Sequence, residues 1–182
     1  MQKYIALLRG VNVGGKNRVV MKELKTCFED YGFVQVKTYL NSGNVIFSSD
    51  ELDTMVLEKV CKTLIEDLTG LTIAVTIVSG KALLKAIEHA PSWWNLDKES
   101  KHNALFIIAP TTPEEVMVSV GEAKPEFEQV SQHERIIFWS APLKTFSRTR
   151  WSKIVGSTYY DRITIRNANT VMKLVEIVKK EK

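Results

Sequence analysis

The chain has few of the residues that build covalent or metal-based scaffolds: its 182 residues include two cysteines and three histidines. Cys27 and Cys61 each fall within an amphipathic stretch, and there is no Cys-x-x-Cys pair. This usage favours reduced, buried thiols and disfavours both disulfides and a metal site. The sequence also lacks a nucleophile turn and carboxylates at metal spacing, so we expect no cofactor, and an enzyme is less favoured than a binding protein.

Long hydrophobic runs are missing too. The first apolar run, Tyr4 to Leu8, is interrupted by Arg9 and is too short for a secretion signal, and no later run approaches a membrane span. The composition, with 45% hydrophobic and 25% charged residues, is ordinary for a soluble globular protein. We therefore expect a cytoplasmic protein with no membrane partner.

The net charge of +4 is placed unevenly along the chain. Residues 1–100 carry 12 basic and 12 acidic side chains, whereas residues 101–182 carry 13 basic and 9 acidic ones. Between Lys144 and Arg166, six basic residues face a single acidic one, and aromatic residues are interleaved with them. Such a segment could neutralise the phosphates and stack the bases of a nucleic acid. The alternative is a solvated charged face whose aromatic rings belong to the core.

Hydrophobic periodicity predicts an α+β protein built from two tandem units. In the first unit, residues 1–80, the pattern predicts strands at 3–13, 33–40, 44–49 and 71–77, with a hairpin turn over 41–43 that ends in Gly43. It also predicts a helix at 21–31 that Gly32 stops and a second helix that Asp50 caps and Gly70 closes. The second of these helices is expected to present an apolar stripe from Leu52 through Val56 to Leu68. The order βαββαβ is ferredoxin-like, with an antiparallel sheet that carries both helices on one face.

The rest of the chain repeats this order after a connector. Residues 81–100 are expected to form a helix and an aromatic-rich loop. A second ferredoxin-like subdomain is expected over residues 101–182, with strands at 103–109, 128–130, 135–140 and 162–165, helices opening at Thr112 and spanning 143–155, and an added C-terminal helix.

A glycine-rich loop that carries a lysine follows the first predicted strand. Gly14 and Gly15 free the backbone to turn N–H groups toward one point, and Lys16 adds positive charge near a helix N-terminus, so the loop predicts an anion site. Asn17 replaces the hydroxyl residue that binds magnesium in a phosphate loop, which disfavours a nucleoside triphosphate site. The alternative is that the two glycines only supply positive φ for a tight connection.

Three sequence blocks resemble the bacterial family called Domain of Unknown Function 1697. They are residues 8–17 (LRGVNVGGKN), residues 39–47 (YLNSGNVIF) and residues 164–174. The resemblance covers essentially the whole chain and implies two ferredoxin-like subdomains, but it implies no activity because the family's function is unassigned. The sequence departs from the family at Ala168, where an aromatic residue is usual. That ring could line a binding surface or act as a packing knob.

The three blocks are rich in glycine and polar residues on short connections, and they could form one site. In the first unit, the predicted topology allows the Gly14 loop and the turn before Asn44 to lie close together. The alternative for Asn44 and Asn167 is a structural role, in a turn and in a helix cap. The candidate ligand-binding residues are Arg9, Asn12, Gly14, Gly15, Lys16, Asn17, Ser42, Asn44, Arg166 and Asn167.

These observations favour a binding module for a phosphate-bearing ligand, either a nucleotide or a single-stranded nucleic acid, in which Arg9, Lys16 and Arg166 contact the anion. A protein-interaction or oligomerising scaffold is the alternative, because Trp93 and Trp94 fall in the connector. An enzyme of nucleotide or phosphate chemistry ranks below both. The oligomeric state is left open.

Overall fold

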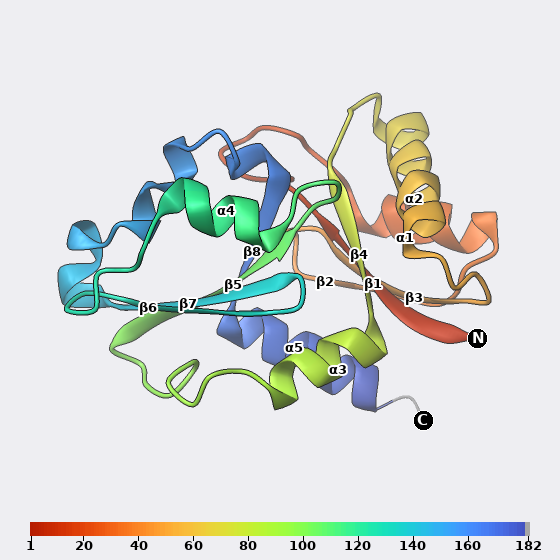
Figure 1. The fold of residues 1–182 in the computed structure, drawn as a ribbon. Coiled ribbons are helices and arrows are strands. Elements are labelled where there is room, and N and C mark those ends of the chain that lie inside the picture. The colour runs from red at the N-terminus through yellow and green to blue at the C-terminus, as the bar shows by residue number, and fades with distance from the viewer. Residues whose placement is uncertain (181–182) are drawn as a thin grey trace. The chain divides into compact units, whose positions relative to one another are not determined.

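The computed structural model describes residues 1–180. The chain forms a mixed α+β fold with two four-stranded antiparallel sheets and a C-terminal helix (Figure 1). Its elements belong to two compact units. The first comprises Met1–Leu84 and the chain from Val175 on, and the second comprises Lys85–Leu174, so the C-terminal helix α5 (Ala168–Lys179) contributes residues to both.

The first unit alternates strands and helices. Its order is β1 (Gln2–Leu8), α1 (Met21–Tyr31), β2 (Val34–Tyr39), β3 (Asn44–Ser49), α2 (Thr54–Thr69) and β4 (Val75–Ser79), and α3 (Gly80–Glu88) begins where β4 ends. The sheet order is β2-β3-β1-β4, and every neighbouring pair is antiparallel. Helices α1 and α2 lie side by side (Figure 1). They share an apolar core with alternate strand residues, among them Tyr4, Ala6 and Leu8.

Capping chemistry sets the ends of these helices. Gly32 ends α1 with a φ of 111°, and Gly70 ends α2 with a φ of 69°. Helix α2 is capped at its N-terminus by Asp53, whose side chain accepts a 2.8 Å hydrogen bond from the backbone N–H of Met55. The expectation that Asp50 caps this helix is therefore wrong.

The expected apolar stripe of α2 is wrong in part. The helix buries Leu57, Cys61 and Ile65, and two residues of the expected stripe, Val60 and Leu64, pack against the same core. The other members, Leu52, Val56 and Leu68, are exposed. Both cysteines are free thiols, but only Cys61 is buried as predicted, whereas Cys27 is half-buried. Burial raises the pKa of the Cys61 thiol.

The second unit repeats the strand pattern with different connections. Its order is β5 (Ser100–Ile107), α4 (Pro113–Val120), β6 (Gln129–His133), β7 (Ile136–Pro142), three 3₁₀ helices and β8 (Ile163–Asn167), followed by the first part of α5. The sheet order is β6-β7-β5-β8, again with antiparallel neighbours. Thr112 caps α4 as predicted, and it forms a reciprocal capping box with Glu115.

The helix expected at residues 143–155 is wrong. The segment forms two separate 3₁₀ helices, η1 (Leu143–Arg148) and η2 (Trp151–Gly156), and η3 (Tyr160–Arg162) follows. The buried carboxylate of Glu128 explains the break, because it accepts hydrogen bonds from the backbone N–H groups of Arg150 (2.7 Å) and Trp151 (3.1 Å). These two donors are thereby removed from the ladder that a continuous α-helix would need.

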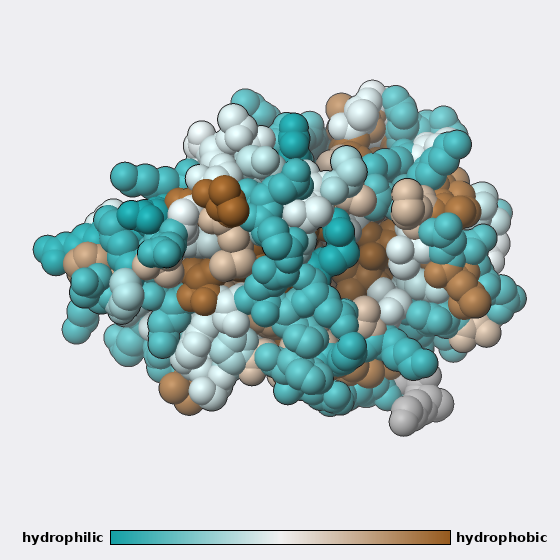
Figure 2. Space-filling view, in the orientation of Figure 1, coloured by the Kyte–Doolittle hydropathy of each residue, from teal (hydrophilic) through white to brown (hydrophobic). Residues whose placement is uncertain are grey.

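One face of the molecule shows how hydrophobic side chains lie among hydrophilic ones (Figure 2). Figure 2 shows a mainly hydrophilic face on which hydrophobic residues form separate patches.

Within residues 1–180, no helix has the length and apolar character needed to cross a membrane. The same part of the chain holds no group of three or more histidine, cysteine, aspartate or glutamate side chains that could bind a metal ion.

Candidate functional site

The glycine-rich loop forms a small exposed hairpin directly after β1. The strand ends at Leu8 rather than continuing to Val13, because Gly10 and Asn12 take φ values of 64° and 55° that a strand excludes. The chain then turns back on itself over residues 10–17, which we call the glycine hairpin.

Both central glycines are needed for the tip of the glycine hairpin. Gly14 and Gly15 take φ values of 57° and 76°, and the backbone N–H of Lys16 donates a 3.0 Å hydrogen bond to the carbonyl oxygen of Val13. Two successive positive φ values are typical of a type I′ turn. A Cβ added at either glycine would meet nothing within 4 Å, so the tip lies in open space.

The prediction that Lys16 lies at a helix N-terminus is wrong. Helix α1 begins at Met21, and its N-cap Val20 makes no side-chain capping bond. The field of a helix dipole is confined to its first turn, so it contributes little at Lys16. The feature that favours an anion here is exposed positive charge, because the side chains of Lys16 and Arg18 are both exposed.

Asparagine side chains hold the glycine hairpin in shape. The Nδ2 of Asn12 donates to the carbonyl oxygens of Val19 (2.9 Å) and Asn41 (2.8 Å), and its Oδ1 accepts from the backbone N–H of Val19 (2.9 Å). The Nδ2 of Asn17 donates to the carbonyl oxygen of Gly10 (3.1 Å). The Asn12 amide therefore ties the hairpin to Val19 and Asn41, and the Asn17 amide bonds within the hairpin.

The turn between β2 and β3 lies against the start of the glycine hairpin. The backbone N–H of Leu8 donates to the carbonyl oxygen of Gly43 over 2.8 Å. Asn44 is fully buried, and its Nδ2 donates to the carbonyl oxygen of Tyr39 (2.8 Å) and to the Oγ of Ser42 (3.2 Å). The first unit thus brings the first two sequence blocks together, and Asn44 has the structural turn role that was the alternative.

The remaining candidates have more internal roles. The half-buried Arg9 donates its backbone N–H to the carbonyl oxygen of Ala74 (2.9 Å). Arg166 belongs to the second unit and is buried. Its guanidinium donates to the Oγ1 of Thr164 (2.8 Å) and to the carbonyl oxygen of Ile165 (3.0 Å). Burial lowers the pKa of Arg166 to about 10, so the side chain keeps its charge at neutral pH.

Asn167 is the candidate that caps α5. Its Oδ1 accepts a 2.8 Å hydrogen bond from the backbone N–H of Thr170, which is the structural role that was the alternative for this residue. It also lines a cleft of the second unit, together with Ala168.

The aromatic rings between residues 144 and 166 pack with the core of the second unit. Trp151 is 1% exposed, and Phe146, Tyr159 and Tyr160 pack against the same apolar cluster. The alternative interpretation therefore holds for Trp151, since a buried indole cannot stack on a base. The rings of Phe146, Tyr159 and Tyr160 are half-buried.

The tryptophan pair of the connector is packed in a similar way. Trp94 is 6% exposed, donates its Nε1–H to the carbonyl oxygen of Asn103 (2.9 Å) and meets the edge of Phe138 at 5.0 Å between centroids. Trp93 is half-buried. Trp94 therefore offers no ring for a partner protein.

A family model for a protein of unknown function, DUF1697, matches residues 1–138, which include both the glycine hairpin and the β2–β3 turn. The chain belongs to this family. The chain is similar to a solved structure of a conserved bacterial protein from Streptococcus pneumoniae, with 30% sequence identity and a TM-score of 0.87. The match covers 98% of this DUF1697 chain and 99% of the Streptococcus pneumoniae chain. No curated protein matches the chain.

Sequence reasoning missed one basic residue in this DUF1697 chain. Arg18 follows the glycine hairpin directly and is exposed, like Lys16. The available signal was the absence of acidic side chains: the 14 residues from Arg9 to Lys22 contain four basic residues and no acidic one.

Proposed function

We propose that the first unit binds a phosphate-bearing ligand and that this ligand is a single-stranded nucleic acid. The observation that carries the proposal is the exposed glycine hairpin, which lies in a 14-residue run with four basic and no acidic side chains. Exposed cationic side chains such as those of Lys16 and Arg18 are what phosphate contacts require.

The internal bracing of the glycine hairpin supports a binding role. Asn12 and Asn17 hold the loop in one shape through four hydrogen bonds. A loop that is already ordered loses less conformational entropy when a ligand binds. A Cβ added at Gly14 or Gly15 would meet nothing within 4 Å, so the tip has open space around it for a ligand.

The spacing of the charges favours a chain of phosphates over a single one. The basic residues of this segment are spaced along the sequence, at Arg9, Lys16, Arg18 and Lys22. A mononucleotide would need walls around its base, whereas the exposed tip provides none. A flexible nucleic acid strand can place successive phosphates beside successive cations.

An amide NMR titration tests this proposal. We expect a short oligothymidylate to shift the signals of Gly14, Gly15, Lys16 and Arg18 saturably, and AMP or inorganic phosphate to shift them less. The double variant Lys16→Gln, Arg18→Gln should lose most of this response. The matched control Lys59→Gln, Lys81→Gln removes two exposed lysines of the same unit and should keep it. An oligonucleotide that leaves the hairpin signals unmoved would contradict the proposal.

We also propose that both units are ferredoxin-like and that the protein works in the cytoplasm. The strand orders β2-β3-β1-β4 and β6-β7-β5-β8 support the first statement, since each matches the sheet of a βαββαβ unit. Free thiols at both cysteines support the second. A crystal structure with another strand order in either unit would contradict the fold assignment.

A further inference from the structure

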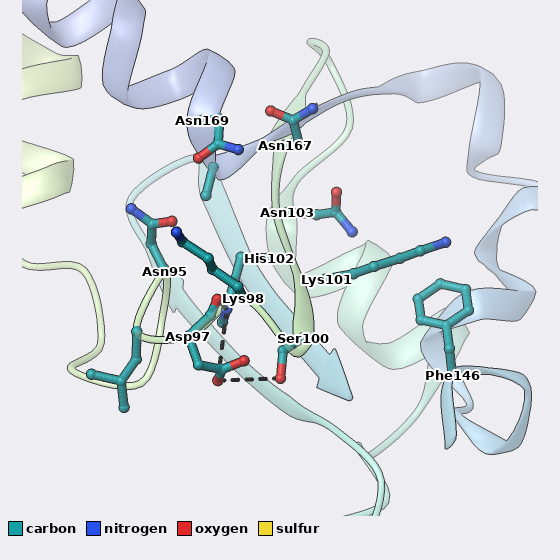
Figure 3. Close-up of a pocket in the computed structure, with 12 residues that line it drawn as sticks. Asn95, Asp97, Lys98, Ser100, Lys101, His102, Asn103, Phe146, Asn167 and Asn169 are labelled. Atoms are coloured by element: carbon teal, nitrogen blue, oxygen red, sulfur yellow. Dashed lines mark hydrogen bonds and ion pairs between the residues drawn. The ribbon is translucent and has the colours of Figure 1, made fainter. Parts of the chain in front are cut away.

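The second unit contains a cleft of about 710 Å³ (Figure 3). Its lining comes from the loop before β5, from β5 itself, from η1, from the end of β8 and from the start of α5. The volume lies within the range of about 300–1,000 Å³ that is usual for small-molecule sites. None of the lining residues belongs to the glycine hairpin, so an inference from this cleft goes beyond the proposed function.

Side-chain amides are the commonest polar groups in the cleft, which is lined by Asn95, Asn103, Asn167 and Asn169. Asn103 on β5 and Asn167 on β8 are direct register partners, so their side chains share one face of the sheet. Figure 3 shows Asn95 and Lys98 on one side of the cleft and Asn103 and Lys101 on the other. A primary amide both donates and accepts hydrogen bonds, which matches the chemistry of hydroxyl groups.

The lining also carries a positive balance. It includes the exposed side chains of Lys98 and Lys101 and one carboxylate, Asp97. That carboxylate is already engaged, because it accepts a 3.3 Å hydrogen bond from the Oγ of Ser100 and lies 3.9 Å from the Nε2 of His102. Two ammonium groups against one carboxylate leave the lining net positive, which favours an anionic ligand.

The cleft has no free aromatic face for a nucleobase. Phe146 is its one aromatic side chain other than His102, and the Nζ of Lys101 lies over this ring at 4.0 Å from the centroid. The ring is also packed against Trp139, with 5.4 Å between centroids. A base could stack on Phe146 only if Lys101 moved away, so the lining favours a ligand that is rich in hydroxyls.

We infer that this cleft binds a sugar phosphate. The sugar hydroxyls exchange hydrogen bonds with the amides of Asn95, Asn103 and Asn169, and the phosphate is bound by the ammonium group of Lys98. Ala168 also lines the cleft and is 3% exposed, so a larger side chain at this position would occupy part of the space that the ligand needs.

The test is an amide NMR titration of the full chain with glucose 6-phosphate, fructose 6-phosphate and ribose 5-phosphate. Glucose and inorganic phosphate serve as separate probes of the two halves of the ligand. We expect at least one sugar phosphate to shift the signals of Lys98, Asn103 and Asn169 saturably, with an affinity at least about tenfold above either half. The absence of a saturable shift with all three would overturn the inference, and so would inorganic phosphate that binds equally well.

Variants separate this site from other cationic surfaces. Lys98→Gln and Asn103→Ala should each weaken sugar phosphate binding about five- to tenfold. Lys153→Gln removes an exposed lysine outside the lining and should leave it unchanged. Ala168→Trp should block binding by filling the cleft, and the Lys98 variant serves the same purpose if the tryptophan variant fails to fold. Wild-type affinity in the Lys98 variant would overturn the inference, whereas loss of oligonucleotide binding at the glycine hairpin would leave it intact.

Discussion

The side-chain amide of Asn12 donates a 2.8 Å hydrogen bond to the carbonyl oxygen of Asn41, 29 positions further along the chain. This bond joins the glycine hairpin after β1 to the turn between β2 and β3. Because the same side chain also makes two hydrogen bonds with the backbone of Val19, it holds the glycine hairpin at both ends. These hydrogen bonds fix the backbone of the segment that carries Lys16 and Arg18.

Replacing Asn12 should therefore weaken both the fold and the binding site. Asn12→Ala removes three hydrogen bonds and should lower the free energy of unfolding by about 2–4 kcal/mol. It should also reduce oligonucleotide affinity because the hairpin loses its fixed shape. Urea unfolding measures the first effect. Asn41→Ala is the matched control, since it keeps the backbone carbonyl, and a similar loss in that variant would contradict the assigned role.

Glycine substitutions should separate close packing from backbone strain. A Cβ at Gly43 would lie 2.6 Å from the Cγ2 of Val11 and 2.7 Å from the Cβ of Leu8, and the residue has a φ of 80°. Gly43→Ala should therefore cost more than 2 kcal/mol, on the order of an overpacked core site. Gly14→Ala carries only the strain of a positive φ, about 1 kcal/mol. Thermal unfolding measures both variants, and equal losses of stability in Gly43→Ala and Gly14→Ala would contradict the difference in packing between the two turns.

Glu128 should be among the residues whose loss most disturbs the second unit. Its buried carboxylate accepts four N–H groups, from the backbone of Lys124, Arg150 and Trp151 and from the indole of Trp139. Glu128→Ala leaves these donors without a partner and should cost about 3 kcal/mol or more. The neighbouring exposed Glu126→Ala is the control. Near-wild-type stability of the Glu128 variant would contradict its role in shaping residues 143–156.

Arg166 should matter for stability rather than for nucleic acid binding. The side chain is 6% exposed and bonds to Thr164 and Ile165, so Arg166→Ala should lower the free energy of unfolding by about 2–4 kcal/mol. Oligonucleotide affinity should stay unchanged at a temperature where the variant is folded. Arg162→Ala removes an exposed arginine and controls for charge. An Arg166→Ala variant that keeps the wild-type free energy of unfolding but loses oligonucleotide binding would contradict this assignment.

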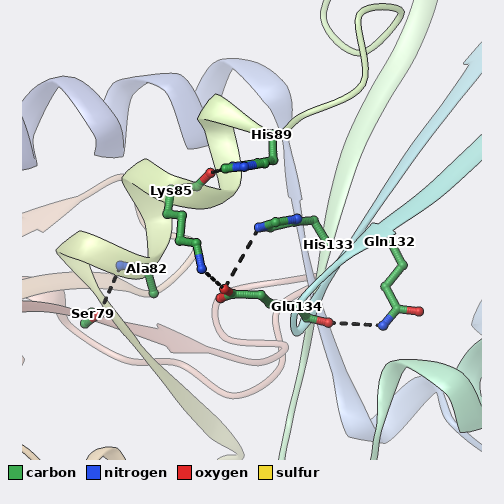
Figure 4. Close-up of polar contacts among 7 residues, drawn as sticks. All are labelled: Ser79, Ala82, Lys85, His89, Gln132, His133 and Glu134. Carbon is green, nitrogen blue, oxygen red and sulfur yellow. Dashed lines mark hydrogen bonds and ion pairs between the residues drawn. The ribbon is translucent and has the colours of Figure 1, made fainter.

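The contact between Lys85 and Glu134 should make a small part of the stability depend on pH. The Nζ of Lys85 donates to the Oε1 of Glu134 over 2.7 Å, beside the stacked rings of His89 and His133 (Figure 4). This hydrogen bond lowers the pKa of Glu134 below its usual value of 4.5. The folded pKa lies below the unfolded one, so the stabilisation is complete above the usual value and is lost as the pH falls through the folded pKa.

Comparison of Glu134→Gln with the wild type checks this dependence. The variant should be slightly less stable at pH 7, and the difference should shrink below about pH 4, where the wild-type carboxylate becomes protonated. Glu126→Gln is the control, because that exposed glutamate should show no such trend. A difference between Glu134→Gln and the wild type that persists in acid would contradict the account.

Local patterns were enough to predict most of the fold. The Gly32 and Gly70 helix ends, the hairpin turn at Gly43 and the Thr112 cap depend on residues next to each other in sequence, and the structure has all four. The break between η1 and η2 could not be predicted this way, because its cause is Glu128, which lies more than twenty residues upstream. The stripe of α2 was placed too far to one side, because the helix centres Leu57, Cys61 and Ile65 on the core and leaves Val60 and Leu64 at its edge.

The candidate site shows the same division. The glycine pair correctly indicated a tight turn, but its distance from α1 depends on where β1 ends, and periodicity placed that end at Val13 instead of Leu8. The cleft of the second unit escaped notice because its asparagines come from β5, β8, a loop and α5, which only tertiary structure brings together.

The most direct test of the account is the salt dependence of oligothymidylate binding, measured by fluorescence anisotropy for the wild type and the Lys16→Gln, Arg18→Gln variant. If both side chains contact phosphates, the variant should bind more weakly and its slope of log K against log salt should be shallower by about 1.4, or 0.7 for each lost contact. The Lys59→Gln, Lys81→Gln control should keep the wild-type slope. Identical slopes in all three proteins would contradict a phosphate-binding role for the glycine hairpin.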